Sequence, residues 1–90
     1  MHIVADRDKL LARVRRIAGQ VAAVERQLTG EAGCSETLQL VASVRGAVGS
    51  LMEELIEQHM REHVACPGLS DEARAAAAEE MLALIRRYGK

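Results

Sequence analysis

Hydrophobic residues recur at helical spacing in three stretches of this chain. In the first stretch, successive apolar positions are four or three residues apart: Leu10, Val14, Ile17, Val21, Val24 and Leu28. This spacing places them on one face of an amphipathic helix. Asp6 precedes the stretch and is a residue type that favours the N-cap position. The pattern therefore predicts a first helix over residues 6–28.

The second stretch is longer and meets no helix-breaking residue before its end. It begins after the glycines at positions 30 and 33, and Ser35 is a candidate N-cap. Its apolar positions are again three or four residues apart: Leu38, Val41, Val44, Val48, Leu51 and Leu55. Pro67 and Gly68 stop the helix. We therefore expect a second helix over residues 35–64.

A capping sequence, Ser70-Asp71-Glu72, opens the third stretch, which predicts a helix over residues 71–88. No stretch alternates in the manner of a strand, so we expect an all-α fold in which residues 1–90 form one domain of three helices. The second helix is long for so small a domain and would leave apolar surface exposed. Antiparallel pairing with the same helix of a second chain, which makes a four-helix bundle, would cover that surface. Gly46 and Gly49 suit a close approach of the second backbone.

The amino-acid composition limits how the core is built and where in the cell the protein is expected to act. Tyr88 is the single aromatic residue among 90, so the core must be built from aliphatic side chains and methionines. No apolar run approaches about 18 residues and no signal-peptide pattern is present, so we expect no membrane span and a cytoplasmic location. Cys34 and Cys66 form no disulfide framework and are expected to be free thiols. No nucleophile–base pair or phosphate-binding loop indicates an enzyme.

Two of the three histidines, His59 and His63, are four residues apart in the second helix. This spacing puts two imidazoles on one helix face, where they either bind a metal ion, pack, or face solvent. Cys34 lies 25 residues before His59, which corresponds to about 37 Å along a straight helix. Within one chain these residues cannot meet. In an antiparallel homodimer, Cys34 of one chain faces His59 and His63 of the other.

The distribution of charge says more about partners than the net charge of −1 does. Basic residues are concentrated in the first helix: Arg7, Lys9, Arg13, Arg15, Arg16 and Arg26. Repeated by oligomer symmetry, such a basic face suits the phosphates of nucleic acid. A charged face on a surface helix is also compatible with simple solvation.

Several sequence segments carry a resemblance to a known family: RVRRIAGQVAAVERQL, the Cys34 that follows it, LQLVASVRGAVGSLMEELIEQH and LIRRY. Together they resemble the CsoR/RcnR family of metal-responsive transcriptional repressors. The resemblance implies three-helix subunits assembled as a homotetramer, a dimer of dimers, that binds operator DNA. It also implies that Arg13, Arg16 and Arg45 contact DNA.

The family pattern of metal ligands falls on Cys34, His59 and His63. The nickel- and cobalt-sensing branch has a further histidine near the N-terminus, and His2 occupies that place here. One thiolate with two or three imidazoles suits Ni(II), Co(II) or Zn(II) better than Cu(I). We therefore expect Ni(II) or Co(II) as the inducer, with Zn(II) binding possible in vitro.

The resemblance implies a repressor that releases its operator on binding metal and thereby derepresses genes for metal efflux or resistance. One alternative is a formaldehyde- or electrophile-responsive repressor of the same fold, which uses Cys34, because the thiolate form favoured at a helix N-terminus also reacts with electrophiles. Another is a small metal-buffering accessory protein without sequence-specific DNA affinity. Cys66 and Glu62 are interpreted as an incidental thiol and a solvated acid rather than as ligands.

Overall fold

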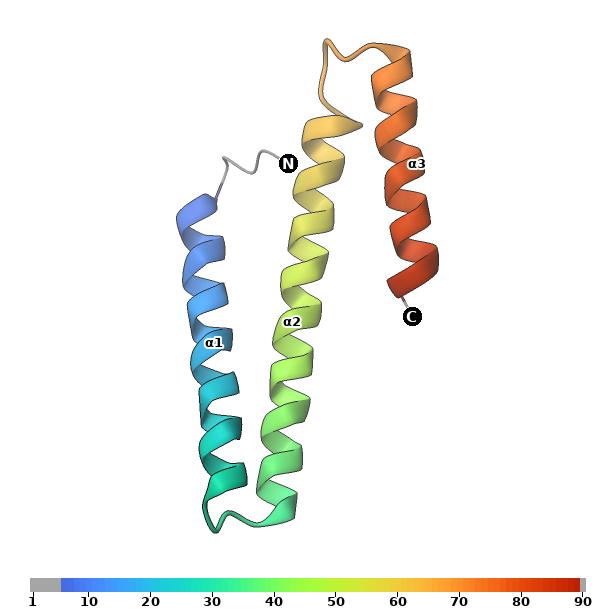
Figure 1. Ribbon diagram of the computed structural model, residues 1–90. Helices are drawn as coiled ribbons and strands as arrows, with labels where there is room; N and C mark the ends of the chain where they lie inside the picture. The colour runs from blue at the N-terminus through green and yellow to red at the C-terminus, as the bar shows by residue number, and fades with distance from the viewer. Residues whose placement is uncertain (1–5, 90) are drawn as a thin grey trace. The chain divides into compact units, whose positions relative to one another are not determined.

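Three α-helices account for most of residues 6–89, the part of the chain that the computed structural model describes (Figure 1). They are α1 (Arg7–Thr29), α2 (Cys34–His63) and α3 (Asp71–Tyr88). No strand occurs within residues 6–89. The predicted three-helix, all-α fold is thus confirmed, and each helix boundary lies within one residue of its prediction. No helix in the described part of the chain is long and apolar enough to cross a membrane.

The N-terminal ends of α1 and α2 both depart from the expected side-chain capping. Asp6 is the N-cap of α1, but it acts through its main-chain carbonyl, which accepts from the Leu10 amide at 2.9 Å, rather than through its side chain. α2 begins at Cys34, so Ser35 lies inside the first turn and the prediction that it caps this helix is wrong. Instead, the Gly33 carbonyl accepts hydrogen bonds from the Thr37 amide at 3.2 Å and the Thr37 hydroxyl at 3.4 Å.

The third helix is capped at both ends. The Ser70 hydroxyl accepts a hydrogen bond from the Ala73 amide at 3.0 Å, as the capping sequence predicts. At the other end, the Gly89 amide donates to the Ile85 carbonyl at 2.8 Å. Gly68, in the connection between α2 and α3, has a φ of 87°, a left-handed conformation that glycine adopts without strain. Pro67 and Gly68 therefore separate two well-defined helices.

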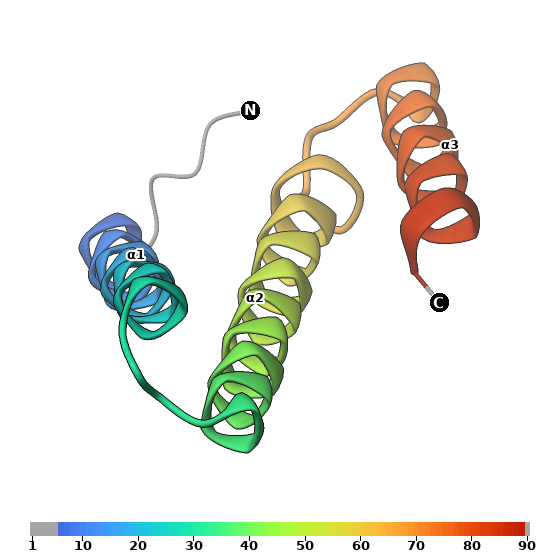
Figure 2. The same cartoon turned by 60° about the horizontal axis from the view of Figure 1, so that its bottom comes forward.

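The chain divides into two compact units, with the boundary inside α2 after Glu53. The first unit contains α1 and the preceding part of α2, which run side by side in both views (Figures 1 and 2). The Gln20 side-chain amide donates to the Ser43 hydroxyl across these two helices at 3.4 Å. The second unit contains the rest of α2, from Glu54, and α3, where Met81 is buried.

Apolar residues in the first unit divide into two sets. On α1, Leu10 is buried and Ile17 and Val24 are half-buried, whereas the remaining large apolar positions are exposed: Leu11, Val14, Val21 and Leu28. α2 repeats this division, with half-buried Leu40, Val44 and Leu51 and exposed Leu38, Val41 and Val48. The predicted apolar face of each helix is therefore two adjacent stripes. Two packed helices bury only one stripe each, so the other remains open.

Candidate metal centre

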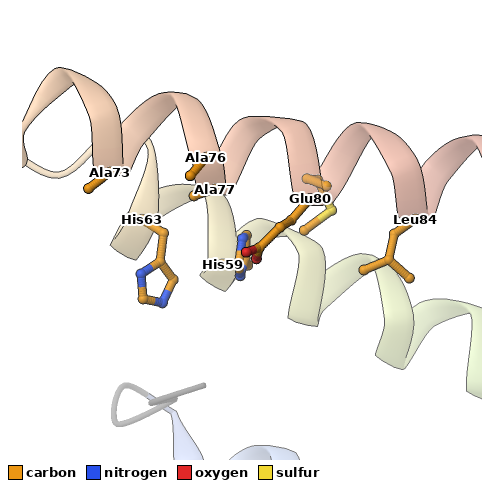
Figure 3. Close-up of a pocket in the computed structure, with 8 residues that line it drawn as sticks. His59, His63, Ala73, Ala76, Ala77, Glu80 and Leu84 are labelled. Carbon is orange, nitrogen blue, oxygen red and sulfur yellow. The ribbon is translucent and has the colours of Figure 1, made fainter.

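His59 and His63 lie one turn apart near the C-terminal end of α2. Their ring centroids are 4.8 Å apart and the ring planes are inclined by 44°. Both rings line a cleft of about 390 Å³ whose other wall is α3 (Figure 3). The residues that α3 contributes to this cleft are Ala73, Ala76, Ala77, Glu80, Met81 and Leu84.

Small side chains on α3 keep the space beside the two rings open. Ala73, Ala76 and Ala77 extend only to Cβ, so α3 contacts the end of α2 without filling the cleft. Glu80 follows them, and its side chain extends toward the His59 ring (Figure 3). The cleft therefore combines two imidazoles with one carboxylate on an otherwise apolar lining.

The environments of the two histidines differ. Both ring nitrogens of His59 are buried, and neither has a hydrogen-bond partner. A buried polar group left in this state costs about 1–3 kcal/mol, so the arrangement calls for a partner. His63 is half-buried, and its Nε2 lies 3.7 Å from a carboxylate oxygen of Glu62. A metal ion that bound His59 would compensate the missing hydrogen bond, and the donor set therefore fits a metal.

One chain does not bring a complete ligand set together. Within residues 6–89, no group of three His, Cys, Asp or Glu side chains is arranged to hold a metal ion. Cys34 is exposed at the first position of α2, at the opposite end from the histidine pair. The predicted ligand His2 lies outside the described residues. Cys66 is half-buried in the α2–α3 connection, with its Sγ 3.5 Å from the Pro67 carbonyl oxygen that it faces.

Cys34 and His59 nevertheless share one stripe of α2. Successive members of this stripe are separated by four and three residues in alternation: Cys34, Leu38, Val41, Arg45, Val48, Met52, Leu55 and His59. That alternation keeps a stripe on one side of a helix. Leu38, Val41 and Val48 belong to the exposed apolar set. The two residue types predicted as ligands thus mark the ends of the same partly apolar surface.

The basic residues predicted to contact DNA occupy different environments. Arg16 is exposed on α1, whereas Arg13, three residues earlier, is half-buried. Arg13 falls in a series of buried or half-buried α1 positions that are three and four residues apart in alternation: Leu10, Arg13, Ile17, Gln20, Val24 and Gln27. Arg45 is exposed but lies in the α2 stripe between Val41 and Val48.

Sequence reasoning did not single out Glu80. The available signal was the run of alanines from Ala75 to Ala78, which indicates a helix face that another helix approaches closely. Glu80 follows Ala76 by one turn and therefore continues that face. Without the pairing of α3 with the end of α2, nothing in the sequence connects Glu80 to the histidines.

Comparison with proteins of known sequence defines the class to which this fold and site belong. The chain is 44% identical over 73 residues to the transcriptional repressor RcnR of Salmonella arizonae, a match that covers 81% of this chain and 79% of the relative. It is also 45% identical over 89 residues, or 99% of this chain and 98% of the relative, to a protein of Serratia marcescens described only by its gene position upstream of bioA.

A solved structure shares the whole fold. A variant of the formaldehyde-responsive regulator FrmR of Salmonella enterica serovar Typhimurium, in which one glutamate is replaced by histidine, superposes with a TM-score of 0.89. The two sequences are 40% identical, and the match covers 98% of this chain and 99% of that one. The Salmonella arizonae relative is thus named as a transcriptional repressor, and the solved structure as a formaldehyde-responsive regulator.

The profile of one family, the metal-sensitive transcriptional repressors, matches residues 6–87. The chain belongs to this family, also called the CsoR/RcnR family, as its sequence motifs predicted. Its members are transcriptional repressors and not enzymes. Membership implies binding to operator DNA and sensitivity to a metal.

Proposed function

We propose that this protein is a cytoplasmic Ni(II)- or Co(II)-responsive repressor that releases operator DNA when metal binds, and so derepresses metal efflux or resistance genes. In this proposal it acts as a homotetramer, a dimer of dimers. Cys34 of one chain and His59 and His63 of its partner are the ligands, with His2 as a further ligand. The observation that carries the proposal is His59, whose two buried ring nitrogens lack partners beside a second imidazole.

Antiparallel pairing along the α2 stripe would complete the ligand set. If Cys34 of one chain faces His59 of the other, the point of two-fold symmetry lies between Gly46 and Ala47, halfway along the stripe. A Cβ added at Gly46 or Gly49 would meet nothing within 4 Å in the single chain. Each glycine directly follows a member of the stripe, about 100° further around the helix, so both lie beside the stripe rather than in it.

The same pairing accounts for the exposed stripe of α1. Counting about 100° per residue from the half-buried positions, Val14, Val21 and Leu28 lie on the same side of the α1–α2 pair as the α2 stripe. The three α1 residues and the α2 stripe together form one apolar face, and two such faces can pack against each other in a four-helix bundle. Arg16 lies on the opposite side of α1 and stays available to phosphates in such a dimer.

Ligand chemistry supports the choice of metal. When bound, the ion would supply a positive centre that joins imidazole and thiolate donors from two chains. Imidazoles with one thiolate make a borderline donor set, which suits Ni(II), Co(II) and Zn(II) better than Cu(I). Zn(II) is satisfied by four ligands, whereas Ni(II) and Co(II) accept more, so the contribution of His2 should matter most for the latter two. The likeness to RcnR points to the same branch.

Metal and operator must oppose each other through thermodynamic linkage. If metal weakens operator binding, the operator weakens metal binding by the same factor, typically equivalent to 1–3 kcal/mol. The apolar face that would carry the metal ligands and Arg16 belong to the same helix pair. A change in the angle between paired chains would therefore change the distances between the Arg16 side chains across the oligomer.

A complementation experiment tests whether the site spans two chains. One chain carries Cys34→Ala and the other carries His59→Ala with His63→Ala, and the two carry different affinity tags so that the heterodimer can be purified. The intersubunit arrangement predicts that the heterodimer keeps one complete site of two, while each parent homodimer keeps none. Equilibrium dialysis with Co(II) counts the sites, and wild type provides the reference of two. A heterodimer that binds no more metal than its parents would refute the arrangement.

Formaldehyde sensing is the second candidate, favoured by the likeness to FrmR. Cys34 is exposed at the N-terminal end of α2, where its sulfur is accessible to an electrophile. The two candidates differ in their dependence on the histidines. With His59→Ala and His63→Ala together, release of operator DNA by Ni(II) or Co(II) should be lost, whereas release by formaldehyde should persist. Fluorescence anisotropy of labelled operator DNA, titrated with each inducer, separates them.

Arg45 requires its own test because it lies in the stripe proposed for the dimer. If Arg45 contacts phosphate, Arg45→Ala should lower the slope of log K against log salt concentration for operator binding and leave dimer dissociation unchanged. If Arg45→Ala instead leaves the salt slope unchanged and alters dimer dissociation, Arg45 belongs to the dimer face and not to the DNA contacts.

A further inference from the structure

The Arg74 side chain connects α3 to the segment that follows the end of α2. It lies in the first turn of α3, and its Nε donates to the Val64 carbonyl at 2.7 Å. A second nitrogen, Nη2, donates to the Cys66 carbonyl at 3.3 Å. Nη1 lies 3.9 Å from the Asp71 carboxylate, which is fully exposed and therefore contributes little.

The two carbonyls occupy the chain just after the histidine pair. Val64 directly follows His63, the last residue of α2. The amides of Val64 and Ala65 both donate to the Met60 carbonyl, at 3.0 and 2.8 Å, and so close the final turn that contains His63. Carbonyls at a helix end have no partner within the helix and bind side chains or water instead. Here a guanidinium from the next helix holds two of them.

We infer that Arg74 is a positioning residue for His63. By holding the carbonyls of Val64 and Cys66 at once, its planar guanidinium fixes the final turn of α2 against the first turn of α3. Ala73, the neighbour of Arg74, lines the cleft together with His63. The link between Arg74 and the turn therefore sets where the His63 ring stands relative to His59, and its relevance to metal binding rests on the proposed function.

The geometry of the contact requires arginine. Two donors in a rigid plane reach two carbonyls separated by one residue, which a lysine ammonium on a flexible chain does less well. Arg74 is half-buried, so its guanidinium is only partly solvated. Arg74→Lys should keep one of the two hydrogen bonds and therefore retain part of the effect that Arg74→Ala loses.

Amide hydrogen exchange in the metal-free protein tests the first part of this inference. Arg74→Ala should lower the protection of the Val64 and Ala65 amides about tenfold relative to wild type, with a smaller loss in Arg74→Lys. Tenfold corresponds to roughly 1.4 kcal/mol. Arg86→Ala, an exposed arginine of the same helix far from the turn, is the matched control and should leave both amides unchanged. Unchanged protection in Arg74→Ala would overturn the inference.

Cobalt spectroscopy tests the second part. In Co(II)-loaded protein the thiolate charge-transfer band reports Cys34, and the ligand-field bands report the coordination geometry. Arg74→Ala should keep the thiolate band but change the ligand-field bands in the direction of the His63→Ala spectrum, and should weaken Co(II) binding about tenfold. Helix content, followed by circular dichroism, should stay at the wild-type level. A wild-type ligand-field spectrum in Arg74→Ala would refute the positioning role.

Failure of the proposed function gives a different result. If wild-type protein shows no thiolate–cobalt band, the metal site itself is wrong, and the exchange of the Val64 and Ala65 amides still decides whether Arg74 holds the turn. If Arg74→Ala fails to fold, Arg74→Lys supplies both measurements. A wild-type spectrum together with wild-type protection in Arg74→Lys would then count against the inference.

Discussion

Removal of apolar surface from the middle of the α2 stripe should raise the dissociation constant of the dimer while leaving the fold of each chain unchanged. The double variant Val41→Ala with Val48→Ala is suitable because these residues flank Arg45 by one turn on each side. Each valine is 46% exposed in the single chain. Nearly half of each side chain is therefore still available for burial by a second copy.

The expected loss follows from that exposed fraction. Each substitution removes two carbons, and complete burial of a carbon is worth about 0.8 kcal/mol. With 46% of the surface left to bury, each valine contributes about 0.7 kcal/mol to the dimer. Two residues in each of two chains give roughly 3 kcal/mol, which raises the dimer dissociation constant by about 100- to 200-fold.

Sedimentation equilibrium over a range of protein concentrations measures this dissociation constant. Leu82→Ala is the control, because Leu82 is 47% exposed but lies on α3 outside the stripe. It should change the constant by no more than about twofold, although the substitution removes three carbons rather than two. Circular dichroism should show unchanged helix content in both variants. Equal weakening by the two variants, or weakening by Leu82→Ala alone, would refute the assignment of the stripe to the dimer.

Further predictions concern DNA, the cleft and the N-terminus. Arg16→Ala should lower the salt slope of operator binding by roughly one for each phosphate that the protein no longer neutralises, without changing the melting temperature. Arg13→Ala should lower the melting temperature as well, because Arg13 is half-buried. Glu80→Gln should weaken Co(II) binding about tenfold in equilibrium dialysis, through loss of the carboxylate beside His59. His2→Ala should leave Zn(II) binding intact but reduce operator release by Ni(II) or Co(II) in fluorescence anisotropy; wild-type release curves would exclude His2 as a ligand.

Helix locations were accessible from the sequence because they depend on local signals. Ser70 was predictable as a cap because its hydroxyl needs only the amide three residues later. The start of α2 was missed by one residue because the Gly33 carbonyl, rather than a side chain, receives the first bonds. Main-chain caps of this kind carry no residue signature.

The division of each apolar face into two stripes could not be read from the sequence. Val14 and Ile17 are equally apolar and three residues apart, yet Val14 is exposed and Ile17 half-buried. Their difference depends on which side of α1 the partner helix occupies, and periodicity describes only the helix itself. Glu80 was missed for the same reason, since its relation to His59 exists only through the pairing of α3 with α2.

In the proposed mechanism, metal binding is coupled to assembly and to DNA binding because one chain carries only part of the ligand set. A site completed within one chain would not by itself join two chains. Here the described residues supply an imidazole pair at one end of α2 and a thiol at the other, on a stripe whose apolar residues Leu38, Val41 and Val48 are exposed. A ligand set divided in this way can be completed only by changing or fixing the relation between two chains. Because Arg16 of α1 lies on the opposite side of the same helix pair, such a change would also move it relative to the operator.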